Sequence, residues 1–169
     1  LKVFSRKASG HRTRVSLRAC LDGARRIVCS RLRQAGAELR IDLPPQDLFV
    51  AADMVQLEQV LVNLIGNACD VLQDQADRRI EVSGRQLDGE VELQVRDSGP
   101  GIDADNLKRV FDPFFTTSES GLGLGLSISH TIIQRLGGTL TVANAPQGGA
   151  VFSVTLTAWD SHRAATSAG

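Results

Sequence analysis

The stretch Asn63-Leu64-Ile65-Gly66-Asn67-Ala68-Cys69-Asp70, near the middle of the 169-residue chain, decides the fold. It belongs to a longer run from Asp53 to Gln75, in which apolar residues recur at spacings of three and four, as on one face of an amphipathic helix. We therefore expect one long helix, capped at its start by Asp53. Its apolar face comprises Leu57, Leu61, Leu64, Ile65, Ala68 and Leu72.

The opposite face of this expected helix carries oxygen-bearing side chains, at Gln59, Asn63, Asn67, Asp70 and Asp74. Asparagine is a mediocre helix former, because its side chain competes for the backbone, so two of them one turn apart suggest a function. Amide and carboxylate oxygens are ligands that Mg²⁺ accepts, together with water and substrate phosphates. On the helix alone, a solvated polar face is an equally good interpretation.

Composition is that of an ordinary globular domain, with 42% hydrophobic and 22% charged residues. Lysine plus arginine equals aspartate plus glutamate at 19 each, so no overall field favours nucleic acid. The first 40 residues are basic, but no aromatic residues alternate with their arginines, so we interpret them as solvated helix faces and expect no nucleic-acid partner.

The three cysteines, Cys20, Cys29 and Cys69, are odd in number and have no metal-ligand spacing, so we expect reduced, mostly packed thiols. No run approaches the roughly 18 apolar residues that span a bilayer, and no signal peptide opens the chain. These features predict a soluble, cytoplasmic domain.

Elsewhere the chain alternates between helical and strand periods. We expect a helix over 18–35 closed by Gly36, a helix ending at Leu136, and one or two helical turns within 105–110. The dipeptide Asp88-Gly89 predicts a hairpin. Strands are expected at 15–17, 38–43, 48–51, 80–87, 91–96, 139–143 and 150–158.

Three glycines, Gly121, Gly123 and Gly125, precede the second of these helices. A glycine-rich helix start offers free backbone N–H groups to phosphate. The spacing matches neither the P-loop nor the dinucleotide-binding fingerprint, and no protein-kinase lysine or H-R-D loop accompanies it. A flexible hinge is the alternative interpretation.

Asp97 ends an apolar strand and is followed by Gly99 and Gly101. Such a carboxylate could accept a hydrogen bond from the exocyclic amine of adenine, with the glycines allowing close approach. An ordinary Asp-Ser-Gly turn is the alternative. The order of four features favours nucleotide binding: an amide-lined helix, this turn, an aromatic loop and a glycine-rich helix start.

Together these motifs resemble the catalytic ATP-binding domain of bacterial sensor histidine kinases. The asparagine box resembles residues 63–68, the first glycine box Asp97-Ser98-Gly99-Pro100-Gly101-Ile102, the phenylalanine box Phe111-Asp112-Pro113-Phe114-Phe115, and the second glycine box Gly121-Leu122-Gly123-Leu124-Gly125-Leu126. The resemblance covers roughly Val15 to Ala158 and is greatest to the dicarboxylate-sensing and nitrogen-regulation branch.

The resemblance implies an α/β fold: a two-layer α/β sandwich with helices packed on one face of a mixed β-sheet, the Bergerat-type ATP-binding fold shared with gyrase, Hsp90 and mismatch-repair ATPases. It implies ATP and Mg²⁺ as cofactors, with Asn67 as the metal ligand, Asn63 assisting, and Asp97 on the adenine amine. Residues 111–120 would form a lid with Phe114 and Phe115 as its hydrophobic latch. The nucleotide contacts it implies are Asn63, Asn67, Asp70, Asp97, Gly99, Gly101, Ile102, Phe114, Phe115, Thr117, Gly121, Gly123, Leu124, Gly125 and Leu126.

Asn63 stands where hydrolysing relatives carry a glutamate general base. An amide cannot take a proton at neutral pH, so we expect slow hydrolysis and a role as phosphoryl donor. The lid differs from the family pattern, because it is short and lacks the basic residue often found after Thr116-Thr117. His11, His130 and His162 lack the context of a phosphoacceptor and are given no role.

The leading hypothesis is therefore a protein-histidine kinase domain that donates the ATP γ-phosphate to a histidine on a dimerisation hairpin absent from this chain, with a response-regulator receiver domain downstream. The alternatives are a regulatory nucleotide-binding module and a hydrolysing ATPase of the same fold. We expect residues 1–14 to end the hairpin and form a linker, 15–158 to form the catalytic domain, and 159–169 to be a disordered tail. The full-length protein is expected to be a membrane-anchored dimer in the bacterial inner membrane.

Overall fold

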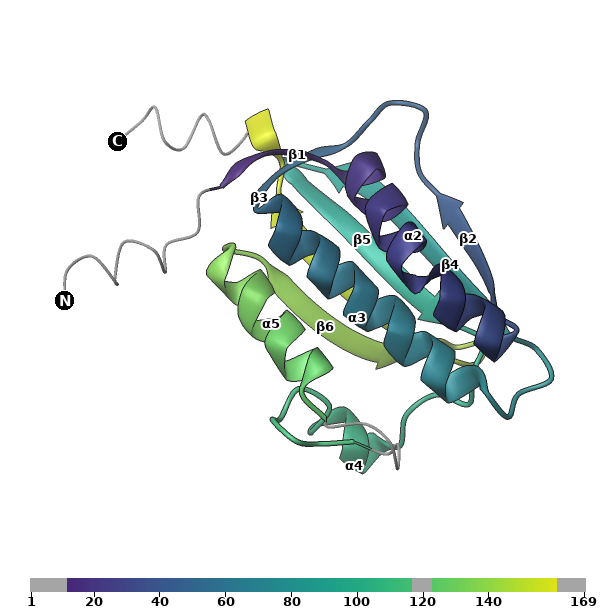
Figure 1. Ribbon diagram of the computed structural model, residues 1–169. Helices are drawn as coiled ribbons and strands as arrows, with labels where there is room; N and C mark the ends of the chain where they lie inside the picture. The colour runs from purple at the N-terminus through teal and green to yellow at the C-terminus, as the bar shows by residue number, and fades with distance from the viewer. Residues whose placement is uncertain (1–11, 117–122, 161–169) are drawn as a thin grey trace.

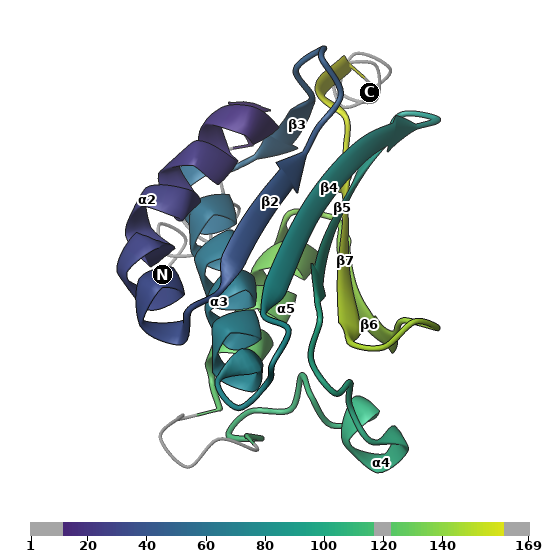
Figure 2. The same cartoon turned by 90° about the vertical axis from the view of Figure 1, so that its right-hand side faces the viewer.

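The computed structural model describes residues 12–116 and 123–160, and its elements form two layers. Three helices lie side by side over one face of a five-stranded sheet (Figure 1). In the edge-on view of Figure 2, no helix of the described residues covers the other face of the sheet. This arrangement is the predicted α/β sandwich. The helices are α2 (Leu17–Ala35), α3 (Met54–Leu72) and α5 (Gly125–Arg135), with a short α4 (Ala104–Leu107) below them.

The sheet is mixed, with strand order β2-β4-β5-β7-β6. Strand β2 pairs with β4 in parallel, and the remaining pairs are antiparallel. A separate antiparallel pair, β1 with β3, is joined to this sheet by a bridge between Val50 and Ala158. The strands are β1 (Thr13–Ser16), β2 (Glu38–Asp42), β3 (Phe49–Ala52), β4 (Arg79–Leu87), β5 (Glu90–Asp97), β6 (Thr139–Asn144) and β7 (Ala150–Thr157).

Local sequence signals place the ends of the two long helices. The Asp53 side chain accepts a hydrogen bond from the Gln56 backbone N–H and caps α3, as predicted. Gly36 ends α2 with φ of 63°, a left-handed conformation that glycine adopts without strain. The first strand is shifted from the prediction, because the Ser16 hydroxyl caps α2 and Leu17 therefore belongs to the helix.

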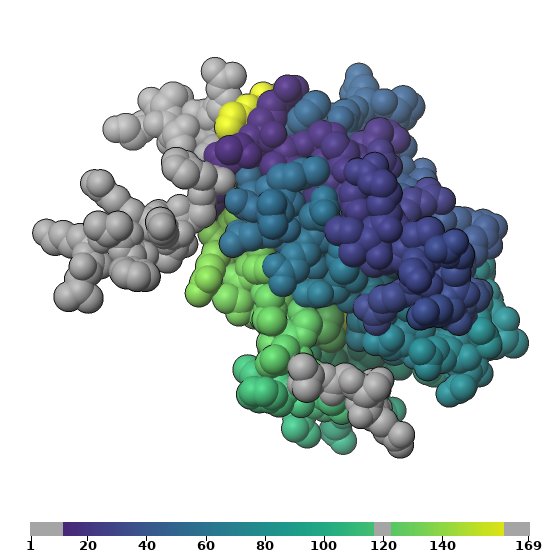
Figure 3. All heavy atoms as spheres, in the orientation of Figure 1, coloured from purple at the N-terminus to yellow at the C-terminus, as the bar shows by residue number. Residues whose placement is uncertain are grey.

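The core lies between the helix layer and the sheet. Helix α3 is its centre, and all six apolar residues predicted for its inner face are buried. Its neighbours α2 and α5 flank it, so the space-filling view in Figure 3 shows the outer surfaces of all three helices. Cys20 and Cys69 are buried, Cys29 is exposed, and all three thiols are free. In the described ranges no helix has the length and apolar character needed to cross a membrane.

Candidate nucleotide site

Asp97 occupies the last position of β5, where strand alternation directs it toward the helix layer. Val91, Leu93 and Val95 precede it on the same buried face, so the carboxylate continues an apolar row. Only 4% of Asp97 is exposed. A charged group buried at the end of such a row is costly unless it has a polar partner.

The hydrogen bonds recorded for this carboxylate both end on one oxygen. The backbone N–H groups of Gly99 and Ala150 donate to Asp97 Oδ1, at 2.9 and 3.4 Å. Burial raises the pKa of Asp97, while these two N–H groups and the charge of Arg96 act in the opposite direction. Within the described residues no hydrogen bond is recorded to Oδ2, so this oxygen remains available to a ligand.

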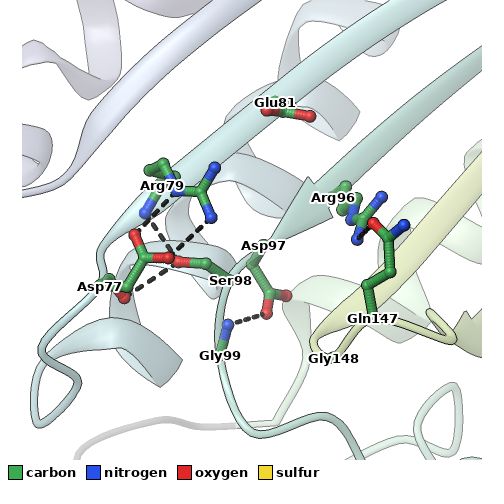
Figure 4. Close-up of a pocket in the computed structure, with 9 residues that line it drawn as sticks. All are labelled: Asp77, Arg79, Glu81, Arg96, Asp97, Ser98, Gly99, Gln147 and Gly148. Carbon is green, nitrogen blue, oxygen red and sulfur yellow. Dashed lines mark hydrogen bonds and ion pairs between the residues drawn. The ribbon is translucent and has the colours of Figure 1, made fainter.

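A hollow of about 290 Å³ lies at the end of β4 and β5 (Figure 4). Arg79, Glu81 and Arg96 line it from the open face of the sheet, opposite to the face toward which Asp97 is directed. The Ser98 hydroxyl donates to the Asp77 carbonyl oxygen and accepts from the Arg79 N–H, which fixes one wall. A Cβ at Gly99 would lie 2.9 Å from Asp97 Oδ1, so a side chain there would crowd the carboxylate. The lining residues are Asp77, Arg79, Glu81, Arg96, Asp97, Ser98, Gly99, Gln147 and Gly148.

Asn63 connects α3 to the start of α5. Its Nδ2 donates to the Gly125 carbonyl oxygen and to Ser129 Oγ, each at 3.2 Å. Because the amide nitrogen makes both bonds, the amide oxygen is left for another partner. Asn67, one turn later, is half-buried, and its side chain has no recorded hydrogen bond to a described residue. The two asparagines therefore leave amide oxygens available on α3.

Asp70 is directed toward α2. Its Oδ1 accepts from Arg31 Nη2 at 2.9 Å, and the same nitrogen donates to the Gly66 carbonyl oxygen at 3.1 Å. Both side chains of the pair are exposed by more than 40%. This ion pair partly neutralises the one carboxylate within a turn of Asn67. The predicted contact of Asp70 with nucleotide stays a prediction.

The second glycine segment packs against the phenylalanine loop. The Phe114 N–H donates to the Gly123 carbonyl oxygen at 2.9 Å, and a Cβ at Gly123 would overlap the Phe114 carbonyl group. Gly123 has φ of 71°, and Phe114 itself has φ of 66°, a strained value for a residue with a side chain. Strain of this kind is often found at functional sites, and Phe114 lies within the segment that the sequence predicts to be a lid.

Helix α5 begins at Gly125 without a side-chain cap, since Leu124 occupies the cap position. Its first backbone N–H groups therefore have no capping oxygen from Leu124, as a phosphate-binding helix start requires. Leu126 is partly buried against the core. The predicted contacts Thr117 and Gly121 lie outside the described residues, as do His11 and His162.

The aromatic loop divides into a buried and an exposed part. Phe111 packs on the core and stacks on His130, with ring centroids 4.8 Å apart, so His130 is a packed residue. Phe114 is 73% exposed, and the Arg109 guanidinium lies 5.1 Å from the centre of the Phe115 ring. In this structure Phe114 is not packed as a latch; its proposed role on nucleotide stays a prediction.

Two contacts at the site were not foreseen from the sequence. Asn144 at the end of β6 makes two hydrogen bonds to the backbone of Ile102, at 2.8 and 2.7 Å. Ser129 accepts the bond from Asn63 and is fully buried. Asn144 lies in the expected hairpin and Ser129 lies one turn into the expected helix, and neither position carries a motif that separates it from its neighbours.

No cluster of three or more His, Cys, Asp or Glu side chains within 12–116 and 123–160 could hold a metal ion. A metal at this site would therefore need amide oxygens and ligand phosphates. Mg²⁺ is often bound in this way, with few protein ligands.

Comparison with known proteins identifies the family of this chain. Residues 52–159 match the family described as histidine kinase-, DNA gyrase B-, and HSP90-like ATPase. The C4-dicarboxylate transport sensor protein DctB of Rhizobium meliloti is 38% identical over 156 residues, which are 92% of this chain and 25% of that protein. The chain thus spans about a quarter of that relative's length.

The solved structures that resemble this chain include histidine kinases. The nucleotide-free catalytic domain of histidine kinase ThkA superposes with a TM-score of 0.76 at 28% identity, covering 88% of this chain and 96% of the other. Histidine kinase ThkA in complex with the response regulator protein TrrA gives a TM-score of 0.72 at 28% identity, covering 86% of this chain and 41% of the kinase chain. The two-layer arrangement and the strand order are therefore those of a kinase catalytic domain.

Proposed function

Because the chain belongs to the family of histidine kinase-, DNA gyrase B- and HSP90-like ATPases, we propose that it binds ATP with Mg²⁺ and donates the γ-phosphate to a histidine on a separate dimerisation hairpin. The observation that carries the proposal is the Asp97 carboxylate. It is buried, its recorded bonds end on Oδ1, and Oδ2 is left to accept the exocyclic amine of adenine. Gly99 keeps the space beside it open.

The phosphate end of the proposed site is formed by α3 and the start of α5. The uncapped backbone N–H groups at Gly125 fit an anion, and the amide oxygens of Asn67 and Asn63 fit a hard cation. Bound Mg²⁺ would offset negative charge on the transferring group. The Arg31–Asp70 pair limits the repulsion that the Asp70 carboxylate would exert on phosphates.

Asn63 favours transfer over hydrolysis. A general base would have to accept a proton from water, and a neutral amide cannot do so. Its nitrogen is also engaged with Gly125 and Ser129, so the side chain holds α5 in place. We therefore propose slow phosphate release by this domain alone.

The acceptor and the downstream partner follow from the proposed kinase role. A hairpin preceding residue 15 would carry the acceptor histidine, and a response-regulator receiver domain would take the phosphoryl group from it. The ThkA complex with TrrA supports the second partner by similarity. In the described chain β1 begins at Thr13, so the linker would reach the domain there. A membrane-anchored dimer is proposed for the full-length protein.

The first test is calorimetric titration of Mg²⁺–ATP into the wild-type chain, Asp97→Asn and the control Glu81→Gln. Glu81 lines the same hollow on the open face of the sheet. We expect wild type and Glu81→Gln to bind alike, and Asp97→Asn to lose at least about 1.5 kcal/mol, the cost of a charge-assisted hydrogen bond. Absence of binding by the wild type would refute the proposal.

The second test adds a separately produced dimerisation hairpin and seeks acid-labile phosphohistidine on it. Transfer to the hairpin, with none to the isolated chain, is the expected result. Binding without transfer would favour a regulatory nucleotide-binding module. Rapid phosphate release by the chain alone would favour a hydrolysing ATPase.

A further inference from the structure

The loop from Asp97 to Ile102 is held at both ends by one hairpin, β6 with β7. At the first end, Ala150 donates to Asp97 Oδ1 at 3.4 Å, and Gly149 packs against the Asp97 carbonyl oxygen. At the second end, Asn144 contacts Ile102. Because Asn144 pairs with Ala150 in the β6–β7 ladder, the two anchoring points belong to one rigid unit.

The side-chain amide of Asn144 bonds to the backbone of Ile102 in the way that a peptide group of a neighbouring strand would. Asn144 Oδ1 accepts from the Ile102 N–H at 2.8 Å, and Nδ2 donates to the Ile102 carbonyl oxygen at 2.7 Å. Both distances are short for hydrogen bonds of this kind. The amide therefore satisfies both backbone groups of Ile102 and fixes where the loop leaves the site.

Gly101 shows how closely the side chain fits the loop. It has φ of 81°, and a Cβ there would lie 2.9 Å from Asn144 Oδ1. The glycine thus allows both the left-handed turn and the approach of the amide. Since Asp97 Oδ1 also accepts from Gly99 within the same loop, the course of the loop and the orientation of the carboxylate are linked.

We propose that Asn144 is a positioning residue for adenine recognition: its two hydrogen bonds to Ile102 hold the 97–102 loop so that the Asp97 carboxylate faces the purine amine. This inference rests on the proposed function. Asn144 itself lies at the surface, and its effect on nucleotide passes through the loop. Asn144 thereby contributes to selectivity for adenine, because Asp97 accepts a hydrogen bond from the amine and a base without this amine cannot form that bond.

The test measures selectivity for the amine. Calorimetry gives the affinities of ATP and of purine riboside triphosphate, which lacks the 6-amino group, for wild type, Asn144→Ala, Asn144→Asp and Gln147→Ala. Gln147 lies on the same hairpin, but its Oε1 accepts from Arg96 at 3.2 Å on the sheet face opposite to Asp97, so its variant is the matched control. Thermal unfolding of each nucleotide-free variant shows whether it is folded.

We expect Asn144→Ala to reduce the preference of the wild type for ATP over the purine analogue about tenfold, corresponding to loss of one hydrogen bond's selectivity. Asn144→Asp keeps the acceptor for the Ile102 N–H but places a carboxylate oxygen against the Ile102 carbonyl oxygen, so its preference for ATP should fall at least as far as that of Asn144→Ala. Gln147→Ala should keep the full preference.

An equal loss of affinity for both nucleotides in Asn144→Ala would overturn the proposal and make the residue merely structural. Unchanged affinities would overturn it as well. Failure of the proposed function has a different signature, because then the wild type would not bind ATP or Asp97→Asn would keep the wild-type preference.

Discussion

Gly149 lies against the backbone carbonyl oxygen of Asp97, so closely that a Cβ on Gly149 would overlap that oxygen. Gly148, the residue before it, also has a positive φ but meets nothing within 4 Å. Substitutions at Gly148 and Gly149 therefore distinguish two effects on stability. Gly148 reports backbone strain alone, and Gly149 reports backbone strain together with a clash against Asp97.

We expect Gly148→Ala to destabilise the domain by roughly 1–2 kcal/mol, the strain of a left-handed residue with a Cβ. Gly149→Ala adds a clash with a backbone atom, so it should cost more and displace Asp97. Chemical denaturation and Mg²⁺–ATP titration measure the two effects. Equal stability and equal affinity in the two variants would contradict the contact.

Asp97→Asn should separate stability from binding. Burial raises the pKa of Asp97, so the folded state holds this proton more tightly than the unfolded chain. The contribution of the protonated carboxyl group to the stability of the fold is therefore complete when the pH is below the ordinary pKa of 3.8. It is lost as the pH rises through the raised pKa of the folded protein. At pH 7 the charged carboxylate disfavours folding, and a neutral amide avoids this cost while still accepting hydrogen bonds through its oxygen.

The nucleotide-free Asp97→Asn variant should thus unfold at the same denaturant concentration as the wild type or a higher one at pH 7, although it binds ATP more weakly. At acidic pH any stability advantage should shrink. A large loss of stability at pH 7 would show that Asp97 is needed to hold the fold. The comparison of unfolding curves at pH 7 and near pH 4 decides this.

The helix and strand pattern could be predicted because the apolar spacing matched the eventual burial. The run from Leu57 to Leu72 became the buried face of α3, and Asp53 capped it. The ends of helices and strands were less predictable where a strand runs directly into a helix. Ser16 lies in a strand as expected, but its hydroxyl also caps α2, so Leu17 belongs to the helix and not to the strand.

The candidate site could be proposed from the sequence only where its residues stand in contiguous motifs. Asp97 and the glycines were proposed because their turn follows an apolar strand directly. Asn144 and Ser129 act across 42 and 66 residues of sequence, so no local pattern could show their contacts. The polar face of α3 also gave no indication of which partner each residue has. In the structure Asn63 contacts α5, whereas Asp70 contacts α2.

The three cysteines should differ sharply in reactivity. Burial raises the pKa of Cys20 to about 12, with the nearby Glu58 charge adding to the effect, and burial also raises the pKa of Cys69. The thiolate is the reactive form, so both should resist alkylation in the folded protein. Cys29 is exposed.

We expect one equivalent of a maleimide to react rapidly at pH 7.5 and mass spectrometry to place it on Cys29. Cys29→Ser should abolish the fast phase and leave the folded protein otherwise unchanged. Rapid labelling of Cys20 in that variant would contradict its burial between α2 and α3. Denaturant should make all three thiols reactive.

Asn63 and Asn67 offer a matched pair for separating packing from metal binding. Asn63→Asp replaces an amide nitrogen that donates to Gly125 and Ser129 with an oxygen, which faces the Gly125 carbonyl oxygen. The lost hydrogen bond to Gly125 and this repulsion should together destabilise the domain by about 1–3 kcal/mol, although the Ser129 hydroxyl can still donate to the new carboxylate. Asn67→Asp should change stability less, because its side chain has no recorded hydrogen bond to a described residue.

The two variants should also respond differently to Mg²⁺. Asn67→Asp retains an oxygen ligand and gains a charge, so its nucleotide affinity should keep its dependence on Mg²⁺, whereas Asn67→Ala should lose most of it. Asn63→Asp should bind nucleotide more weakly with or without the metal, because the start of α5 is no longer held. Titrations of ATP with Mg²⁺ and with EDTA make the comparison. If Asn67→Ala kept the full Mg²⁺ dependence, Asn67 would not be the metal ligand, and the role would pass to the oxygen of Asn63.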